Sequence, residues 1–345
     1  MRGSLSARGE HAFLDALCER LAERRRSSGA GSGLLVGPGD DAAVVETGGR
    51  PLAITTDALV ERVHFRPGWL APAELGVRAI AVALSDLAAT GATPRWTLVS
   101  AIVPPDRPTS ELDRILEACA AASEESGAAM IGGNLSRGDA LSLTVTAIGE
   151  MEGPTLERRG ARPGDRLVVT GTLGAAAAAV DVWLDGGEPP PALRERFARP
   201  VARLAAGRAL AAAGATAAID VSDGLLADLG HLCRASGVGA EVERARLPRL
   251  VQVAIRDASG SDFAATGGED YELLAALPPG IDDDAITALA RACDVELTVI
   301  GRCTAPGTGI RLLGEDGRDR ATARRGFDHF ADGESPGPRG RRVPD

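Results

Sequence analysis

The segment LLVGPGDDAAVVET, residues 34–47, places two neighbouring carboxylates, Asp40 and Asp41, just before the apolar run at residues 42–45. The apolar run predicts a short buried strand, since it is bounded by turn-forming residues. Two carboxylates at the mouth of such a strand repel each other, so the pair raises the question of what cation makes both tolerable. Neighbours in an extended segment point to opposite sides. We therefore expect one carboxylate to face a cation and the other to face away.

Short apolar runs and helical patterns alternate outward from this segment along both halves of the chain. Residues 10–26 carry Phe13, Leu14, Leu17 and Leu21 at helical spacing. The mixture of strands and helices predicts an α/β or α+β protein. In the first half, strands are predicted at 33–36, 42–45, 51–57, 95–104, 128–134 and 141–151, and helices at 10–26, 73–92 and 109–127.

The texture of the sequence changes near residue 155, where GARPGDRLVVTG forms a turn that leads into a new strand. A chain of 345 residues is more often two domains than one. We place the domain boundary at about residue 152, with an N-terminal domain at 1–151 and a C-terminal domain at 152–330. The remaining residues, 331–345, are rich in Gly, Pro and charge, which predicts a disordered tail.

Composition excludes several classes of protein. The formal net charge of -10 disfavours a nucleic-acid-binding protein, which is usually basic. All 38 basic residues are arginine and no lysine occurs in the chain. A P-loop, a protein-kinase fold and a pyridoxal enzyme each need a lysine, so all three are disfavoured.

The cysteines and the apolar runs indicate the cellular compartment in which the protein works. The five cysteines are scattered and form no Cys-x-x-Cys pair, so we expect reduced thiols rather than a disulfide framework. No signal sequence is evident, and no apolar run reaches the ~20 residues that a membrane-spanning helix needs. The sequence therefore predicts a cytoplasmic protein that has neither membrane nor nucleic acid among its partners.

Carboxylates recur where strands end or helices begin. Any one of them has an ordinary explanation as a turn residue or helix cap. Asp86 is different because it lies inside an apolar helix, where an acid is costly to bury unless it is paired or bound to metal. Together the acids favour a shared site for Mg²⁺ or Mn²⁺, since oxygen ligands without clustered His or Cys suit hard cations. The acids in question are Asp57, Asp86, Asp220, Asp223, Glu269 and Asp270.

Glycines supply possible anion contacts. The segments MIGGNLSRG (130–138) and VVTGTLGAAAAAV (168–180) could bring backbone N–H groups against a phosphate. A plain turn is the simpler interpretation of Gly132 and Gly133 taken alone. Arg137 and Arg158 are candidate phosphate clamps, with a solvated surface arginine as the alternative for each.

Taken in order, these segments resemble one family. GDDAAVV, ITTDALVERVHF, VALSDLAATGATPRW, IGGNLSRG, RRGARPGDRLVVTGTLG, IDVSDGLLADLGHL, GGEDYELL and GFDHF follow the pattern of thiamine-monophosphate kinase, from about residue 10 to 330. That family belongs to the superfamily of aminoimidazole-ribotide synthetase and selenophosphate synthetase. The resemblance implies a two-domain PurM-like α/β fold, whose N-terminal domains form a β-barrel shared across a homodimer. It also implies ATP-dependent phosphorylation of thiamine monophosphate to thiamine diphosphate with several Mg²⁺ ions.

The resemblance also assigns roles to single residues. Positions matching the Mg²⁺ ligands are Asp41, Thr55, Thr56, Asp57, Asp86, Asp220 and Asp223. Positions matching the ATP contacts are Gly133, Asn134, Arg158 and Ser222, and those matching the thiamine-phosphate contacts are His64, Glu269 and Phe327. By the same comparison Asp41 is the ligand at the opening segment, and Asp40 is a turn residue or a neighbour of the ligands.

One position departs from the family pattern. Where the family usually has Asp after the two glycines, this chain has Asn134. Asparagine keeps a carbonyl oxygen for Mg²⁺ and loses one negative charge, so we expect a neutral metal ligand there. Asp139, five residues on, is a candidate for compensating that charge, although a loop position is the simpler interpretation.

The expected chemistry needs no catalytic side chain. The attacking group is a phosphate monoester, which is mostly dianionic at pH 7 because its second pKa is about 6. Direct transfer then depends on positioning and on charge neutralisation by Mg²⁺, without a general base or a covalent intermediate. His64 would bind substrate phosphate or close the site, with a packed imidazole as the alternative. Phe327 would stack on a thiamine ring, and Glu269 would pair with the aminopyrimidine or the cationic portion.

Two alternative functions remain at this stage. Another enzyme of the superfamily is disfavoured, because selenophosphate synthetase needs a reactive Cys near the N-terminal glycines and a hydrogenase-maturation protein needs a C-terminal Cys. The nearest candidate, Cys18, lies in a helical pattern, and the chain ends in RRVPD. A non-catalytic thiamine-phosphate or nucleotide-binding protein is the other alternative, and Asn134 is the one feature that favours it.

Overall fold

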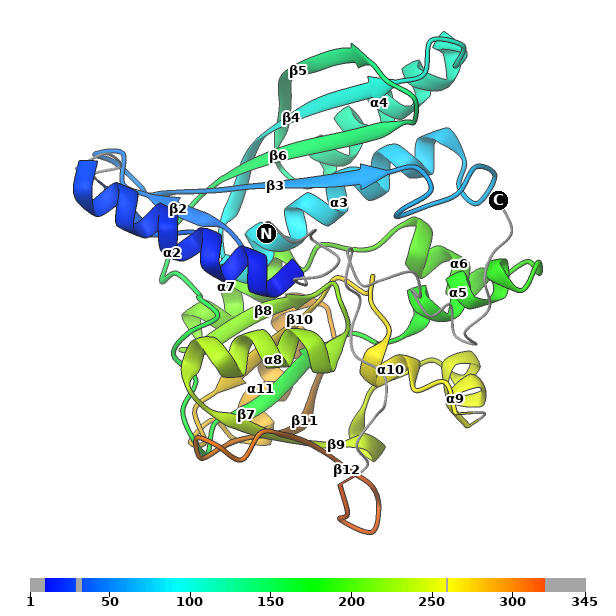
Figure 1. Cartoon of the computed structure of the whole chain (residues 1–345). Helices are drawn as coiled ribbons and strands as arrows, with labels where there is room; N and C mark the ends of the chain where they lie inside the picture. Colours follow the sequence, from blue (N-terminus) through cyan, green and yellow to red (C-terminus); the bar gives the residue numbers. More distant parts are fainter. Residues whose placement is uncertain (1–9, 29–32, 259, 320–345) are drawn as a thin grey trace, which may run out of the picture.

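The structure is a computed structural model that describes residues 10–28, 33–258 and 260–319. Its strands form two separate six-stranded sheets (Figure 1). The first has the order β1-β2-β3-β6-β4-β5, with only β4 and β5 parallel. Its strands are β1 (Leu34–Val36), β2 (Ala43–Val45), β3 (Leu52–Val60), β4 (Thr93–Val103), β5 (Ala129–Arg137) and β6 (Ser142–Glu150).

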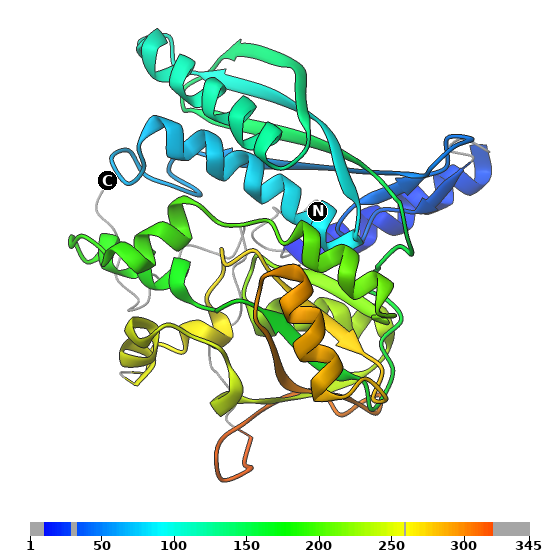
Figure 2. The same ribbon diagram turned by 180° about the vertical axis from the view of Figure 1, so that it is seen from behind.

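The first sheet packs one face against α3 (Pro72–Thr90) and α4 (Thr109–Glu125), as Figure 2 shows from behind. Alternation along the strands determines which side chains make that face. In β6, Leu143, Val145 and Ala147 are buried, while their neighbours are only half-buried. The other face of the sheet is therefore open in a single chain.

The second sheet has the order β12-β9-β11-β7-β10-β8, with only β9 and β12 parallel. Every residue of β8, at one edge of the sheet, and of its neighbour β10 is buried, because α3, α7 and α8 pack against these strands. The strands are β7 (Arg166–Thr170), β8 (Ala217–Val221), β9 (Gly239–Glu243), β10 (Glu272–Leu277), β11 (Leu297–Thr304) and β12 (Ile310–Leu313). The helices are α5 (Ala175–Leu184), α6 (Pro191–Ala198), α7 (Leu204–Ala212), α8 (Leu225–Ser236), α9 (Val251–Ala258), α10 (Phe263–Thr266) and α11 (Asp283–Cys293), with a 3₁₀ turn η1 (Arg244–Arg246).

Helix α3 lies between the two sheets and contacts both, as well as α4 and α7. Small residues let these helices approach closely. A Cβ on Gly76 would lie 2.2 Å from the carbonyl oxygen of Ile115 in α4, and a Cβ on Gly207 of α7 would lie 1.9 Å from that of Ala88. Because α3 is covered nearly all round, any polar side chain on it is enclosed and needs a partner.

Aromatic side chains join the two halves beside α3. Trp69, in the loop before α3, stacks on Trp183 of α5 with ring centroids 4.9 Å apart and an interplanar angle of 11°. Phe197 of α6 meets both rings edge-on. On the outer surface nearby, Glu74 of α3 accepts two hydrogen bonds from Arg194, each 2.7 Å long. The halves are thus held by apolar packing that is bordered by a charged pair.

The two sheets confirm the predicted two-domain α/β class. Two local predictions were wrong. Gly132 and Gly133 do not form a turn, because they lie inside β5, and Gly133 is needed there since a Cβ would fall 1.8 Å from the carbonyl oxygen of Val99. Asp57 does not end its strand: β3 runs on to Val60, and Asp57 pairs with Val145 of β6.

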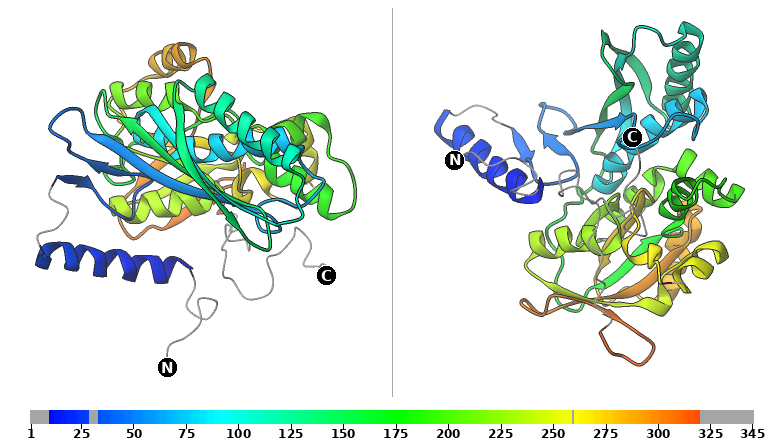
Figure 3. Two further views of the ribbon diagram at one scale, coloured as in Figure 1. Left: turned by 90° about the horizontal axis from the view of Figure 1, so that it is seen from above. Right: turned by 45° about the vertical axis from the view of Figure 1, so that its right-hand side comes forward.

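The N-terminal helical pattern forms α2 (Glu10–Ser28), on which Leu14 and Leu21 are each 43% exposed (Figure 3, deep blue). No helix among the described residues is both long enough and apolar enough to cross a membrane. The predicted tail at 331–345 lies outside the described residues.

The contact between α3 and α7 gives a stability prediction. Gly207→Ala should lower the free energy of unfolding by about 1–3 kcal/mol, because the new methyl group overlaps the backbone of Ala88. Gly230→Ala in α8 is the matched control, since its Cβ would meet the flexible end of Arg234 at 3.3 Å and the tip of Ile310 at an ordinary 3.8 Å. Denaturant unfolding should show no loss for the control. Equal stability of wild type and Gly207→Ala would contradict the close helix contact.

Candidate functional site

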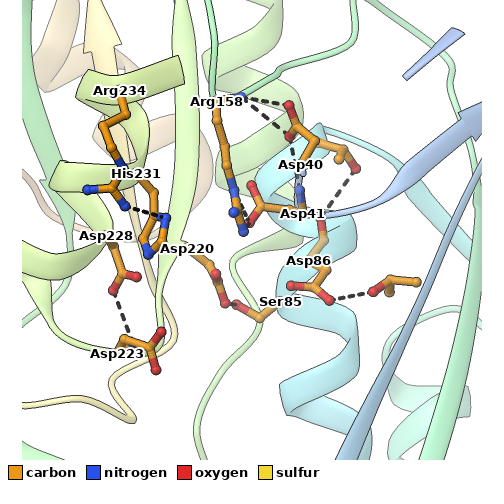
Figure 4. A network of polar contacts seen from close by, with 12 residues as sticks. Asp40, Asp41, Ser85, Asp86, Arg158, Asp220, Asp223, Asp228, His231 and Arg234 are labelled. Atoms are coloured by element: carbon orange, nitrogen blue, oxygen red, sulfur yellow. Dashed lines mark hydrogen bonds and ion pairs between the residues drawn. The ribbon is translucent and has the colours of Figure 1, made fainter. Parts of the chain in front are cut away.

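Three carboxylates from distant parts of the chain meet between the two sheets (Figure 4). Asp41 comes from the turn between β1 and β2, Asp86 from α3, and Asp220 from the end of β8. One oxygen from each lies within 4.8 Å of the others. The sequence predicted that acidic residues from different elements share one site, and the fold brings these three together. We call them the acid cluster.

The two aspartates of the opening segment face different ways. Asp41 is 8% exposed, and its Oδ1 accepts hydrogen bonds from Nε and Nη2 of Arg158 at 3.1 and 2.6 Å. Asp40 instead accepts from the backbone N–H of Arg158 at 3.1 Å and from that of Asp41 at 3.0 Å. Burial, and then the neighbouring Asp41, raise the pKa of Asp40 to about 6. Asp40 therefore holds the turn that presents Asp41.

Hydroxyl groups orient the other two acids. Thr55 of β3 donates to Oδ2 of Asp86 at 2.5 Å, and Ser85 donates to Oδ2 of Asp220 at 2.7 Å. Burial raises the pKa of Asp220 to about 7, with the charge of Asp41 adding to the effect. Burial, followed by the charges of Asp220 and Asp41, raises the pKa of Asp86 well above its ordinary range. The cluster thus carries more negative charge than its surroundings tolerate.

The cluster suits a hard divalent cation. Its donor atoms are all oxygens, the choice of Mg²⁺ and Mn²⁺. Oδ2 of Asp41 is buried and has no hydrogen-bond partner among the described atoms, although buried polar atoms are normally satisfied. The guanidinium of Arg158 contacts one of the three carboxylates, that of Asp41. A cation would complete both the charge balance and the coordination of that oxygen.

The other candidate metal ligands stand at different distances from the cluster. Asp57 faces the same side of β3 as Thr55 and lies close enough to raise the pKa of both Asp86 and Asp220. Thr56 is exposed on the opposite side of the strand, so the fold does not bring its side chain to the cluster. Asp223 lies on the loop after β8, where its backbone N–H donates to Asp228 at 3.1 Å.

The candidate ATP contacts fall into two groups. Arg158 touches the acid cluster, and Ser222 lies two residues after Asp220. Gly133 and Asn134 instead lie on β5, the exposed outer strand of the first sheet (Figure 1), where the Asn134 amide donates to Ser136 at 2.9 Å. Within one chain the structure does not show these two residues joining the acid cluster. Arg137, at the end of the same strand, is also exposed.

The candidate thiamine-phosphate contacts also differ in position. Nδ1 of His64 accepts from the backbone N–H of Val60 at 2.9 Å, in the loop that follows β3. Glu269 lies beside the loop after β8, since its N–H donates to the carbonyl of Ser222 at 2.7 Å. Phe327 lies outside the described residues.

Sequence reasoning missed three residues near this site. Ser85 orients Asp220, and Asp228 holds the loop after β8 by accepting the N–H groups of Asp223 and Gly224. Arg78 is a fully buried cation on α3. The sequence could have indicated Arg78, because this charged residue interrupts the same apolar helical pattern as Asp86. The roles of Ser85 and Asp228 depend on contacts between elements, which their local sequence does not reveal.

Comparison with known proteins agrees with this geometry. Residues 39–151 match the N-terminal domain of AIR synthase related proteins, and residues 162–312 match the C-terminal domain. The chain is 38% identical to the thiamine-monophosphate kinase of Salmonella typhimurium over 324 residues, 92% of this chain and 98% of that protein. It is 38% identical to the corresponding kinase of Mycobacterium tuberculosis over 279 residues, covering 79% and 81% of the two chains.

A solved structure described as AaThiL complexed with AMPPCP and TMP superimposes with a TM-score of 0.81 at 32% identity, covering 96% of this chain and all of that one. The similarity in sequence extends through both sheets and the acid cluster between them. This chain belongs to the thiamine-monophosphate kinase family.

Proposed function

We propose that this protein transfers the γ-phosphoryl group of ATP to the phosphate of thiamine monophosphate, giving thiamine diphosphate and ADP. The observation that carries the proposal is the acid cluster with its unpartnered Asp41 oxygen, in a chain 38% identical to such kinases. A bound analogue of ATP and a molecule abbreviated TMP in the AaThiL structure give further support.

Mg²⁺ ions are the proposed cofactor. Asp41, Asp86 and Asp220 would hold them, with Asp57 close by and Asp223 on the adjacent loop. When bound, Mg²⁺ supplies charge neutralisation on the phosphoryl oxygens, which lets two polyanions approach each other. Thr55 and Ser85 keep the carboxylates aimed at the site, while Arg158 balances part of their charge.

The two substrates would meet at the acid cluster. Arg158 and Ser222 are the proposed nucleotide contacts in this chain, and His64, Glu269 and Phe327 the proposed thiamine-phosphate contacts. The acceptor phosphate is already largely ionised at neutral pH, so no side chain has to remove a proton from it. The residues contribute by binding and orienting the reactants.

We also propose that two copies pair through the open face and edge of the first sheet. An exposed sheet edge invites pairing with another strand, and large exposed apolar patches mark interfaces. On β5, Ile131 is 58% exposed and Leu135 is 63% exposed, and on β4, Ile102 is 39% exposed. A shared barrel built from two such sheets would cover these residues. It would also enclose Gly133 and Asn134, so Asn134 is proposed as a neutral ligand in the assembled dimer.

The proposed activity is tested by turnover. Purified protein with ATP, Mg²⁺ and thiamine monophosphate should form thiamine diphosphate and ADP in equal amounts. Asp86→Asn should lower kcat at least about 100-fold, because it removes a charge that holds the cation. Asp294→Asn is the control, since it makes the same change at an exposed residue of left-handed conformation that Asn also adopts. Tight ligand binding without diphosphate formation would overturn the kinase assignment in favour of a binding protein.

The pKa of Asp220 predicts how cation binding depends on pH. Its folded value of about 7 lies above the ordinary 3.8, so the protonated form stabilises the fold, and this stabilisation is lost as pH rises from about 4 to 7. Protons then compete with Mg²⁺ in this range. Apparent Mg²⁺ affinity should be about tenfold weaker at pH 6 than at pH 8. Mg²⁺ should accordingly raise Tm more at pH 8, and Asp220→Asn should reduce that difference.

The proposed pairing surface is tested by molar mass in solution. Wild type should elute with twice the 35.3 kDa of one chain. Leu135→Glu should be monomeric, because it places a charge in the covered patch. Val251→Glu on α9 is the control, since Val251 is 72% exposed but belongs to the other half of the chain. A wild-type protein of 35.3 kDa in solution would contradict the pairing.

A further inference from the structure

The GGEDYEL segment folds into a turn with an unusual backbone. Glu269 and Tyr271 both have positive φ angles, 73° and 50°, which cost roughly 1–3 kcal/mol each in residues other than glycine. Their N–H groups donate to the carbonyls of Ser222 and Val221 at 2.7 and 2.8 Å. Between them, Asp270 accepts from the N–H of Gly174 at 2.6 Å, at the start of α5. The turn is therefore fixed to the loop that follows Asp220.

Arg78 of α3 reaches this turn from inside the protein. Its side chain is fully buried, and Nη1 donates to the carbonyl oxygen of Phe197. The guanidinium carbon lies 4.0 Å from the ring centroid of Phe197 and 5.7 Å from that of Tyr271. Nη2 makes an ion pair with Oε2 of Glu269. A buried guanidinium requires an anion, and Glu269 supplies it.

The carboxylate of Glu269 is held through one of its two oxygens. The hydroxyl of Tyr271 also donates to Oε2, at 3.2 Å. Oε1 makes no hydrogen bond to any described residue, and the side chain is 28% exposed. Arg78 and Tyr271 thus fix the carboxylate from behind and leave Oε1 for an outside partner. That partner must donate a hydrogen bond or carry positive charge, since an ionised carboxylate only accepts.

We propose that Arg78 is a positioning residue that holds Glu269 so that Oε1 meets the cationic or N–H-donating part of thiamine monophosphate. This inference rests on the function proposed above. Arg78 is itself too buried to touch a ligand, so it acts through Glu269. The same helix carries Asp86, and one rigid element therefore sets both the acid cluster and the substrate carboxylate.

The test is a double-mutant cycle on the full chain, with KM for thiamine monophosphate, KM for ATP and kcat as readouts. Arg78→Met should raise KM for thiamine monophosphate about tenfold and leave KM for ATP within about twofold, because only the orientation of Glu269 is lost. Glu269→Gln should raise the same KM at least as much. The double variant should be no worse than Glu269→Gln alone, since Arg78 has no separate route to the substrate.

Two further variants protect the test against a folding defect. Arg78→Lys keeps a cation near Glu269 but cannot reproduce the planar stack on Phe197, so its KM should lie between wild type and Arg78→Met. If Arg78→Met does not fold, the cycle is run with Arg78→Lys. Arg194→Met is the matched control, because it breaks a different ion pair of α3, the one between Glu74 and Arg194 of α6. It should lower Tm while leaving KM for thiamine monophosphate unchanged.

The outcomes separate the two proposals. Independent, additive effects of Arg78→Met and Glu269→Gln would overturn the positioning role, as would an equal rise in KM from Arg194→Met. Either result would leave the kinase function intact, provided that wild type forms thiamine diphosphate in the same assay. A wild type that forms none overturns the function and the positioning role together.

Discussion

The folded chain is organised around an electrostatic conflict. Asp41, Asp86 and Asp220 converge in a partly buried space, where the guanidinium of Arg158 contacts only the Asp41 carboxylate. Bringing like charges together out of water costs free energy, and here the cost appears as raised pKa values for Asp86 and Asp220. Thr55, Ser85 and Arg158 each hold one of the three carboxylates in place. The cation proposed for this site would relieve the repulsion between these carboxylates.

Helix α3 lets two separate sheets share one site. It is covered on nearly all sides, and Gly76 and Gly207 allow α4 and α7 to approach its backbone. A helix so enclosed keeps its orientation, so its few polar side chains are placed with little freedom. Asp86 belongs to the acid cluster and Ser85 donates a hydrogen bond to Asp220 of that cluster, whereas Arg78 makes an ion pair with Glu269. Packing around one helix thus sets the spacing between the acid cluster, proposed to bind metal, and the proposed substrate carboxylate.

The local sequence predicted which segments form strands and helices, but it predicted poorly where they end and which residues they contact. The strands and helices could be predicted, because alternation and helical periodicity are local properties. The shared acidic site could be predicted from acids that recur at the ends of these elements and inside an apolar helix. Asp57 was predicted to end its strand, but pairing with β6 carries β3 three residues further. Gly132 and Gly133 were predicted to form a turn, yet they pair with Leu98 and Val99 of β4 as strand residues. Arg78 could be seen as an anomaly in its helix, but its partner Glu269 lies 191 positions along the chain and only the fold identifies it.

The stacked pair Trp69 and Trp183 has an experimental consequence. The chain contains only three tryptophans, and the third, Trp96, lies on β4. Two parallel indoles 4.9 Å apart couple their electronic transitions, so they should give a paired band of opposite signs in the far-ultraviolet circular dichroism spectrum. Because one ring belongs to each half of the protein, that band reports on the contact between the halves. The molecule therefore carries an intrinsic optical probe of domain movement during turnover, without any added label.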